Sequence, residues 1–309
     1  MISDTLQLVR MINCYDGMTI RQVMRRFRLA DGSYTDCSKR LAQLAQPAKN
    51  SKRQSGSVLE QKVIPHPTKI RGGASAVYVV GPLGRALLQE HGDEVKRQKF
   101  ERGTGISDHN WHSFWVNDIF ITAHLWADAK PGVRIAAKMT DFDMKRDKRF
   151  PYPVAWEDGT AHKTEMDGLL GIKRAEHIGK DKQYLLELET GSNEPAKIRQ
   201  KVQSLVAFVS QFEKVFGTRL FNGFLFFATA TYGLKQGNPR YESPDDQRKI
   251  ILREIAKTLM EIGYEHYAPL FRVTACPLDG TNLFTDPVWY FPAVGPCDYD
   301  NYHLFVDVS

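Results

Sequence analysis

Residues 221–232, FNGFLFFATATY, most constrain the fold of this 309-residue chain. The run is apolar at successive positions rather than at alternate ones, which is typical of a strand buried on both faces. The run is therefore interpreted as a buried central strand of a sheet. The flanking sequence predicts the order helix, strand, strand, strand, helix, strand, helix, strand. This order indicates an α/β fold, specifically a three-layer sandwich.

Periodicity and turn residues set the expected bounds of these elements. The helices are expected at residues 108–127, 194–216 and 243–262, and the strands at 133–139, 165–172, 184–189, 221–232 and 270–276. Ser243 suits the N-cap of the last helix, and Pro244 suits its first position. A basic, turn-rich insertion is expected at 141–162. An irregular tail packed across the sheet is expected at 277–309.

The first hundred residues predict a different kind of unit. Three short helices are expected, with Thr19 capping the second, followed by two strands and a fourth helix. Their ranges are 2–14, 20–27, 34–45, 61–64, 76–80 and 81–90. This is the order of a winged helix-turn-helix. The charged stretch 96–105 divides a winged-helix domain, residues 1–100, from a second domain, residues 101–309.

Charge differs between these two parts. Residues 1–105 contain 18 Lys and Arg against 9 Asp and Glu, whereas the remainder contains 24 against 27. A basic module on a mildly acidic body indicates polyanion binding, and we expect double-stranded DNA. The alternatives are a basic surface that only confers solubility and a winged helix that contacts proteins.

The winged-helix hypothesis assigns specific DNA contacts. The recognition helix would enter the major groove and present polar and basic side chains to the bases. These residues are Ser33, Tyr34, Thr35, Ser38, Lys39 and Arg40. Basic residues elsewhere in the domain would contact phosphates. They are Arg25, Arg26, Arg28, Lys69 and Arg71.

Carboxylates in the second domain indicate a metal site. Glu187 and Glu189 lie two residues apart in YLLELE, so they share one face of their strand. Burying both is costly unless a cation offsets them. Asp167 on a neighbouring strand would complete an oxygen site for Mg²⁺, or Mn²⁺ in its place, with Asp167 and Glu187 as the ligands. Lys201 on the following helix would stabilise charge on a phosphate.

The alternative assignment is structural. Glu187 and Glu189 would then face solvent on an edge strand and pair with Lys201 or Arg199. Surface ion pairs of this kind contribute little to stability and need no function.

Cellular location is constrained by what the sequence lacks. No stretch approaches about 20 uninterrupted apolar residues, so no membrane span is expected. Residues 1–17 lack a basic n-region followed by an apolar h-region, so no secretory signal is expected. The four cysteines form no CxxC pair, which disfavours a zinc ribbon and a disulfide framework. A cytoplasmic protein is expected.

Residues 5–232 resemble the replication-relaxation family of plasmid and mobile-element proteins. The resemblance rests on the winged-helix pattern, on His112 followed by Asn117-Asp118, on MDGLL, and on LLELETG followed by KIRQKVQSLVAF. It implies a second domain with a restriction-endonuclease-like, PD-(D/E)XK fold. Asp167 matches the strand acid and Glu187 the following Glu.

The sequence departs from the PD-(D/E)XK pattern at one position. Glu189 stands where an active PD-(D/E)XK enzyme usually has Lys. Lys201 matches a basic position on the next helix of the family. Cleavage would therefore require Lys201, Lys197 or Gln200 to replace that lysine.

The expected function is DNA binding in the replication, mobilisation or DNA processing of a plasmid, phage or other mobile element. In the active form, Asp167, Glu187, Glu189 and Lys201 would make a metal-dependent DNA endonuclease. Expected partners are DNA, relaxase, replication or other mobile-element proteins, and a second copy of the chain. The alternatives are a winged-helix transcriptional regulator with an inactive C-terminal domain that dimerises or binds a partner or ligand, and a structural accessory of a relaxase complex.

Overall fold

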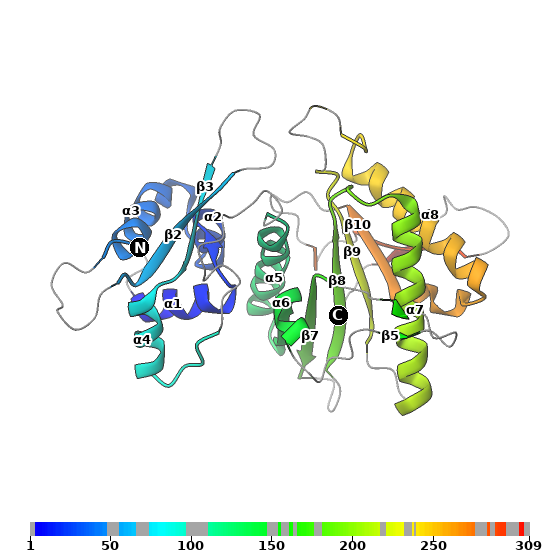
Figure 1. The fold of residues 1–309 in the computed structure, drawn as a ribbon, viewed down its shortest axis with the longest axis horizontal. Helices are drawn as coiled ribbons and strands as arrows, with labels where there is room; N and C mark the ends of the chain where they lie inside the picture. The colour runs from blue at the N-terminus through cyan, green and yellow to red at the C-terminus, as the bar shows by residue number, and fades with distance from the viewer. Residues whose placement is uncertain are drawn as a thin grey trace. The chain divides into compact units, whose positions relative to one another are not determined.

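The chain is a mixed α/β protein that divides into two compact units, Met1–Ile121 and Thr122–Ser309 (Figure 1). A computed structural model provides the coordinates. It describes residues 4–47, 56–65, 74–96, 111–146, 154–155, 161–162, 166–175, 181–216, 221–231, 237, 239–275, 283–284, 288–294 and 303–305. Within these ranges, no helix is long and apolar enough to cross a membrane.

Up to Glu90, the described residues of the first unit form four α-helices and a small antiparallel sheet. Its elements are α1 (Thr5–Cys14), β1 (Met18–Thr19), α2 (Ile20–Arg26), the 3-10 helix η1 (Asp31–Ser33), α3 (Tyr34–Leu44), β2 (Leu59–Pro65), β3 (Ala74–Val80) and α4 (Pro82–Glu90). The strand order is β1-β3-β2. The four predicted helices and two predicted strands are confirmed, whereas the two-residue β1 was missed because so short a strand has no periodicity.

Local chemistry fixes the second helix as expected. Thr19 caps α2 by accepting a hydrogen bond from the Gln22 backbone N–H at 3.2 Å. Gln22 returns the bond by accepting from the Thr19 N–H at 3.0 Å, which makes a capping box. The Gln22 amide also donates to the Phe114 carbonyl at 2.6 Å. One side chain therefore both starts α2 and holds a later segment against it.

The helix α5 (Trp111–Ala129) begins within the first unit. Asn117 is buried and donates to the Tyr15 carbonyl at 2.7 Å. Asp118 forms an ion pair with Arg25 on α2 at 2.8 Å. These contacts explain why the first unit extends to Ile121, beyond the boundary at residues 100 and 101 that charge and composition indicated.

Gly84 is expected to be irreplaceable at the start of α4. A Cβ on Gly84 would lie 2.3 Å from the Val58 carbonyl oxygen, which is backbone and has no rotamer by which to move away. We expect Gly84→Ala to cost about 1–3 kcal/mol of stability through overpacking. Thermal denaturation checks this. Gly32→Ala is the control, because nothing lies within 4 Å of its added Cβ; equal melting temperatures for the two variants would contradict the expectation.

The second unit is built on a seven-stranded mixed sheet with the order β12-β11-β10-β9-β8-β7-β4. The strands are β4 (Val133–Thr140), β7 (Gly168–Arg174), β8 (Lys182–Glu189), β9 (Gly223–Ala228), β10 (Phe271–Ala275), β11 (Trp289–Phe291) and β12 (His303–Phe305). Strands β8, β9 and β10 are parallel, and the other pairs are antiparallel. Every residue of β9 is buried, which confirms the predicted central strand.

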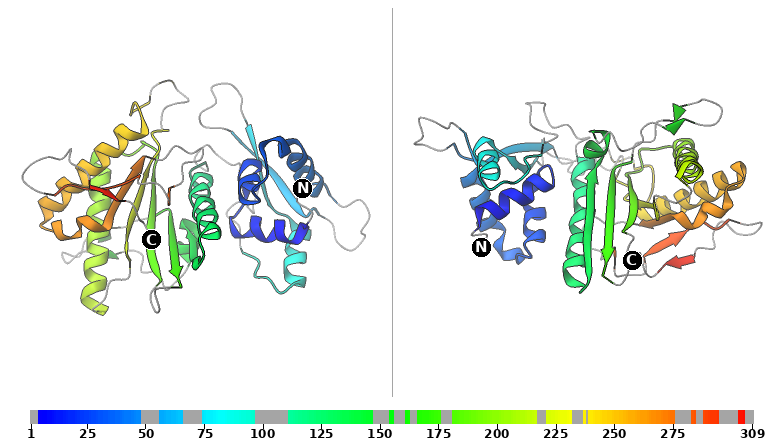
Figure 2. Two further views of the ribbon diagram at one scale, coloured as in Figure 1. Left: turned by 180° about the vertical axis from the view of Figure 1, so that it is seen from behind. Right: turned by 90° about the horizontal axis from the view of Figure 1, so that it is seen from below.

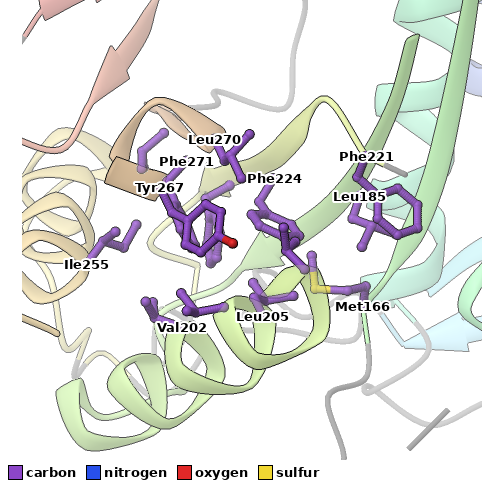
Figure 3. Close-up of a cluster of buried hydrophobic side chains, with 14 of the residues drawn as sticks. Met166, Leu185, Val202, Leu205, Phe221, Phe224, Ile255, Tyr267, Leu270 and Phe271 are labelled. Carbon is purple, nitrogen blue, oxygen red and sulfur yellow. The ribbon is translucent and has the colours of Figure 1, made fainter. Parts of the chain in front are cut away.

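Both crossover helices, α7 (Pro195–Phe216) and α8 (Pro244–Ile262), lie on one face of the sheet (Figures 1 and 2). Val202 and Leu205 of α7 point toward Phe224 of β9 in the core (Figure 3). On the opposite face, Phe227 packs edge-on against Trp289, with ring centroids 5.2 Å apart. Burial on both faces removes the central strands from water and makes the sheet the core of this unit.

The ends of α8 follow from sequence alone. Ser243 accepts a hydrogen bond from the Asp246 N–H at 3.1 Å, and Pro244 is the first helical residue, as expected. Gly263 ends the helix in the left-handed conformation, with φ of +73°. The N-cap prediction is therefore confirmed.

Three expectations outside these elements were wrong. The stretch after β4 is not all turn, because Thr140 and Asp143 form reciprocal hydrogen bonds that start the helix α6 (Asp141–Arg146). The tail is not all irregular, because β11 and β12 extend the sheet beyond β10. Asp167 lies one residue before β7 rather than within it. Two short strands, β5 (Val154–Ala155) and β6 (Ala161–His162), pair separately.

Candidate functional site

The two glutamates of β8 are buried on the face that α7 covers. Glu187 and Glu189 are 3% and 1% exposed. They pair in register with Phe226 and Ala228 of β9, whose side chains belong to the core beneath α7 and α8. Since β8 lies between β7 and β9, the alternative that placed these glutamates in solvent on an edge strand was wrong.

Lys201 of α7 lies against both carboxylates. Its ammonium donates to Glu187 Oε1 and, at 3.4 Å, to Glu189 Oε1. Asp167 joins them from the turn before β7, where its Oδ2 accepts a hydrogen bond from the Leu188 N–H at 2.7 Å. The structure thus brings together all four residues that the sequence assigned to the site.

The cluster holds more negative than positive charge. Burial, followed by repulsion from Asp167, raises the pKa of Glu187 well above its usual value, although Lys201 opposes the shift. Burial alone would lower the pKa of Lys201, but Glu187, Glu189 and Asp167 together raise it above the usual value. Lys201 therefore remains protonated at neutral pH, and Glu187 has a strong tendency to hold a proton.

One carboxylate oxygen of the cluster lacks a protein donor. Glu187 Oε2 is buried and has no hydrogen-bond partner among the residues that the structure describes. An oxygen of this kind costs stability unless a proton or a cation satisfies it. The donor set of Asp167 and Glu187 is all oxygen, which suits Mg²⁺ or Mn²⁺. Across the described ranges, however, no three acidic, His or Cys side chains are arranged as a metal-holding group.

Of the three residues considered to replace the missing lysine, Lys201 is the one that forms ion pairs with the carboxylates. Lys197 and Gln200 are exposed on α7. Arg199, the other partner considered for the glutamates, instead pairs with buried Glu254 of α8 at 2.6 Å.

Sequence analysis missed several residues around the cluster. Asn193 donates to Glu189 Oε2 at 2.9 Å from the loop after β8. Burial, with help from the nearby Glu189 and Glu254 carboxylates, raises the pKa of Tyr241 despite the opposing effect of Arg240. The signal for Glu254 was available, because it occupies a core-facing position of α8 at helical spacing from Ile251.

In the first unit, the predicted DNA contacts differ in accessibility. Tyr34 is 46% exposed on the first turn of α3. Thr35, Lys39 and Arg28 are also exposed. The remaining polar residues of this group are partly buried: Ser33, Ser38 and Arg26.

Two predicted contacts are engaged within the protein. Arg40 donates hydrogen bonds to Thr5 at 2.9 Å and to Gln43 at 3.2 Å. Arg25 pairs with Asp118 on α5. Lys69 and Arg71 lie outside the described residues. Tyr34, Thr35 and Lys39 are therefore the exposed members of the predicted recognition helix.

Comparison with protein-family models, with curated proteins and with solved structures found no match to the chain. A functional conclusion therefore depends on the geometry of the carboxylate cluster and on the basic first unit.

Proposed function

We propose that the chain is a DNA-processing protein of a plasmid, phage or other mobile element. Its first unit binds duplex DNA as a winged helix, and its second unit is a metal-dependent endonuclease with a restriction-endonuclease-like fold. The observation that carries the proposal is the convergence of partly buried Asp167 and Lys201 on buried Glu187 and Glu189. Two buried glutamates and a partly buried aspartate beside one lysine destabilise a fold, which favours a chemical role.

The buried Glu187 Oε2, which lacks a hydrogen-bond donor among the described residues, supports the proposal that a cation binds here. Asp167 and Glu187 would hold Mg²⁺ or Mn²⁺, since both supply oxygen ligands. The ion would supply polarisation of a phosphate oxygen and activation of a water. Lys201 keeps its proton and offers positive charge to the phosphate, while Asn193 fixes the orientation of Glu189.

The topology of the first unit supports the winged helix. The order of α1, β1, α2, α3, β2, β3 and α4 and the strand order β1-β3-β2 fit that fold. In this arrangement α3 is the recognition helix and β2 and β3 form the wing. Exposed Tyr34 and Lys39 on α3 are then available for DNA.

Cleavage of supercoiled plasmid tests the enzyme. The full chain is incubated with Mg²⁺ or Mn²⁺ and with EDTA, and the Glu187→Gln variant is treated identically. We expect nicked or linear product from the wild type only when the cation is present. The cleavage rate of the variant should be at least about 100-fold lower, because loss of a residue that merely hydrogen-bonds to a metal ligand already lowers metal affinity or activity 10–100-fold. Equal cleavage by the two proteins would assign the activity to contamination and reject the proposal.

DNA binding has its own expected outcome. Lys39→Ala should weaken duplex binding and reduce the slope of log affinity against log salt by about 0.9, since one phosphate contact is lost. Fluorescence anisotropy over a salt series measures both quantities. Lys257→Ala, an exposed lysine of α8, is the matched control. If Lys39→Ala binds like this control, α3 does not contact DNA.

A transcriptional regulator with an inactive second unit is the second candidate. Lys201 already neutralises part of the carboxylate charge, and no metal-holding group occurs across the described ranges. Under this alternative, the wild type binds duplex DNA with the expected salt dependence but leaves plasmid intact with every cation.

A further inference from the structure

The chain turns sharply where the central strand β9 ends beside the carboxylate cluster. Ala230, two residues after β9, has φ of +49°. Residues other than glycine rarely adopt this left-handed conformation, because Cβ approaches the backbone carbonyl. Such strain persists only where the surroundings enforce it, and it is concentrated at functional sites.

Gln247 enforces the turn. Its Oε1 accepts a hydrogen bond from the Ala230 N–H at 2.7 Å, and the side chain is 1% exposed. It lies in the first turns of α8, whose start is fixed by the Ser243 cap. A buried amide on a capped helix is therefore hydrogen-bonded to the backbone of the strained residue.

The strained turn contacts the glutamate strand directly. Ala228 pairs with Glu189 in the parallel β8-β9 ladder. The next residue, Thr229, donates its N–H to the Glu189 carbonyl at 3.0 Å, and its hydroxyl also reaches that carbonyl at 3.3 Å. Thr229 and Thr231 share a hydrogen bond between their hydroxyls at 3.2 Å. The turn thus fixes the backbone of Glu189 from one side.

We propose that Gln247 is a positioning residue of the candidate site. By holding Ala230 in the left-handed conformation, it keeps the turn at residues 229–231 against Glu189 and so fixes the carboxylate cluster for a divalent cation. This inference rests on the proposed function. In open α/β sheets, ligands bind beyond the carboxyl ends of parallel strands, and this turn lies at that edge.

Isothermal titration calorimetry of the full chain with Mn²⁺ tests the inference. We expect Gln247→Ala to weaken Mn²⁺ binding about tenfold, as loss of an outer-shell partner does. Adding Ala230→Gly to Gln247→Ala should recover affinity at least about threefold, because glycine adopts the left-handed conformation without steric cost. A general loss of packing would not be repaired by this second change.

Controls separate the possible results. Thr258→Ala removes another buried polar group of α8, remote from the turn, and should leave Mn²⁺ affinity unchanged. Faster amide hydrogen exchange at Ala230 in Gln247→Ala would show that Gln247 restrains the turn, by a measurement that does not depend on enzymatic activity. If the wild type binds Mn²⁺ and Gln247→Ala binds it equally, the inference alone fails. If the wild type binds no Mn²⁺, the proposed metal site fails and the inference with it.

Discussion

Replacing Lys201 with methionine is expected to lower the stability of the second unit by about 3–5 kcal/mol, the usual cost of removing one partner from a buried ion pair. Its ammonium is paired with Glu187 and Glu189, and Asp167 acts on the same charge. Methionine has a similar length but no charge. The variant would therefore leave the buried Glu187 and Glu189 beside partly buried Asp167 without a positive charge to offset them.

Thermal and urea denaturation measure this loss. A decrease of roughly 6–20 °C in melting temperature corresponds to that free energy for a unit of this size. Lys197→Met is the matched control, because it is the same change at an exposed position one turn earlier on α7. The control should shift stability by less than about 0.5 kcal/mol. Similar melting temperatures for the two variants would show that the Lys201 ammonium does not offset the carboxylates.

The Glu187→Gln variant is expected to be more stable than the wild type at neutral and alkaline pH while losing the cleavage that we propose. The pKa of Glu187 is raised in the folded state, so the fold favours its protonated form. The resulting stability is fully present below the unfolded pKa and is lost as the pH rises through the folded pKa. Glutamine resembles the protonated acid and does not titrate.

Melting temperatures at a series of pH values show whether the wild type or Glu187→Gln is the more stable protein. Below about pH 4, where the unfolded glutamate is also protonated, the wild type and Glu187→Gln should melt alike. Their difference should grow in favour of Glu187→Gln as the pH rises above that range. If the wild type instead becomes more stable than the variant with increasing pH, the fold favours the Glu187 anion. Burial would then not raise the pKa of Glu187.

Strong local signals explain which elements were predictable. The Ser243-Pro244 start of α8 depends on a cap and a fixed φ, both within a few residues. The apolar run of β9 needs burial on both faces whatever its partners are. The helix α6 had a comparable signal in Thr140 and Asp143, but the basic residues around it indicated a loop.

The shared face of Glu187 and Glu189 was also fixed by sequence, because side chains alternate along any strand. The burial of the two glutamates could not be predicted from sequence, since an edge strand and an interior strand can have the same local sequence pattern. Only the pairing of β8 between β7 and β9 decided it. Gln247 was undetectable as a partner of Ala230 for the same reason, because its role depends on where a capped helix meets the end of a strand.

The sequence by itself determined every long helix, the central strands, the basic charge of the first unit and the set of acids in the second. These depend on periodicity, caps and composition, which act over a few residues. The tertiary structure alone decided that Lys201 lies against Glu187 and Glu189, and that Arg25 pairs with Asp118. Ion pairs between distant residues depend on how elements pack, because a charged side chain reaches only a few ångströms from its own backbone.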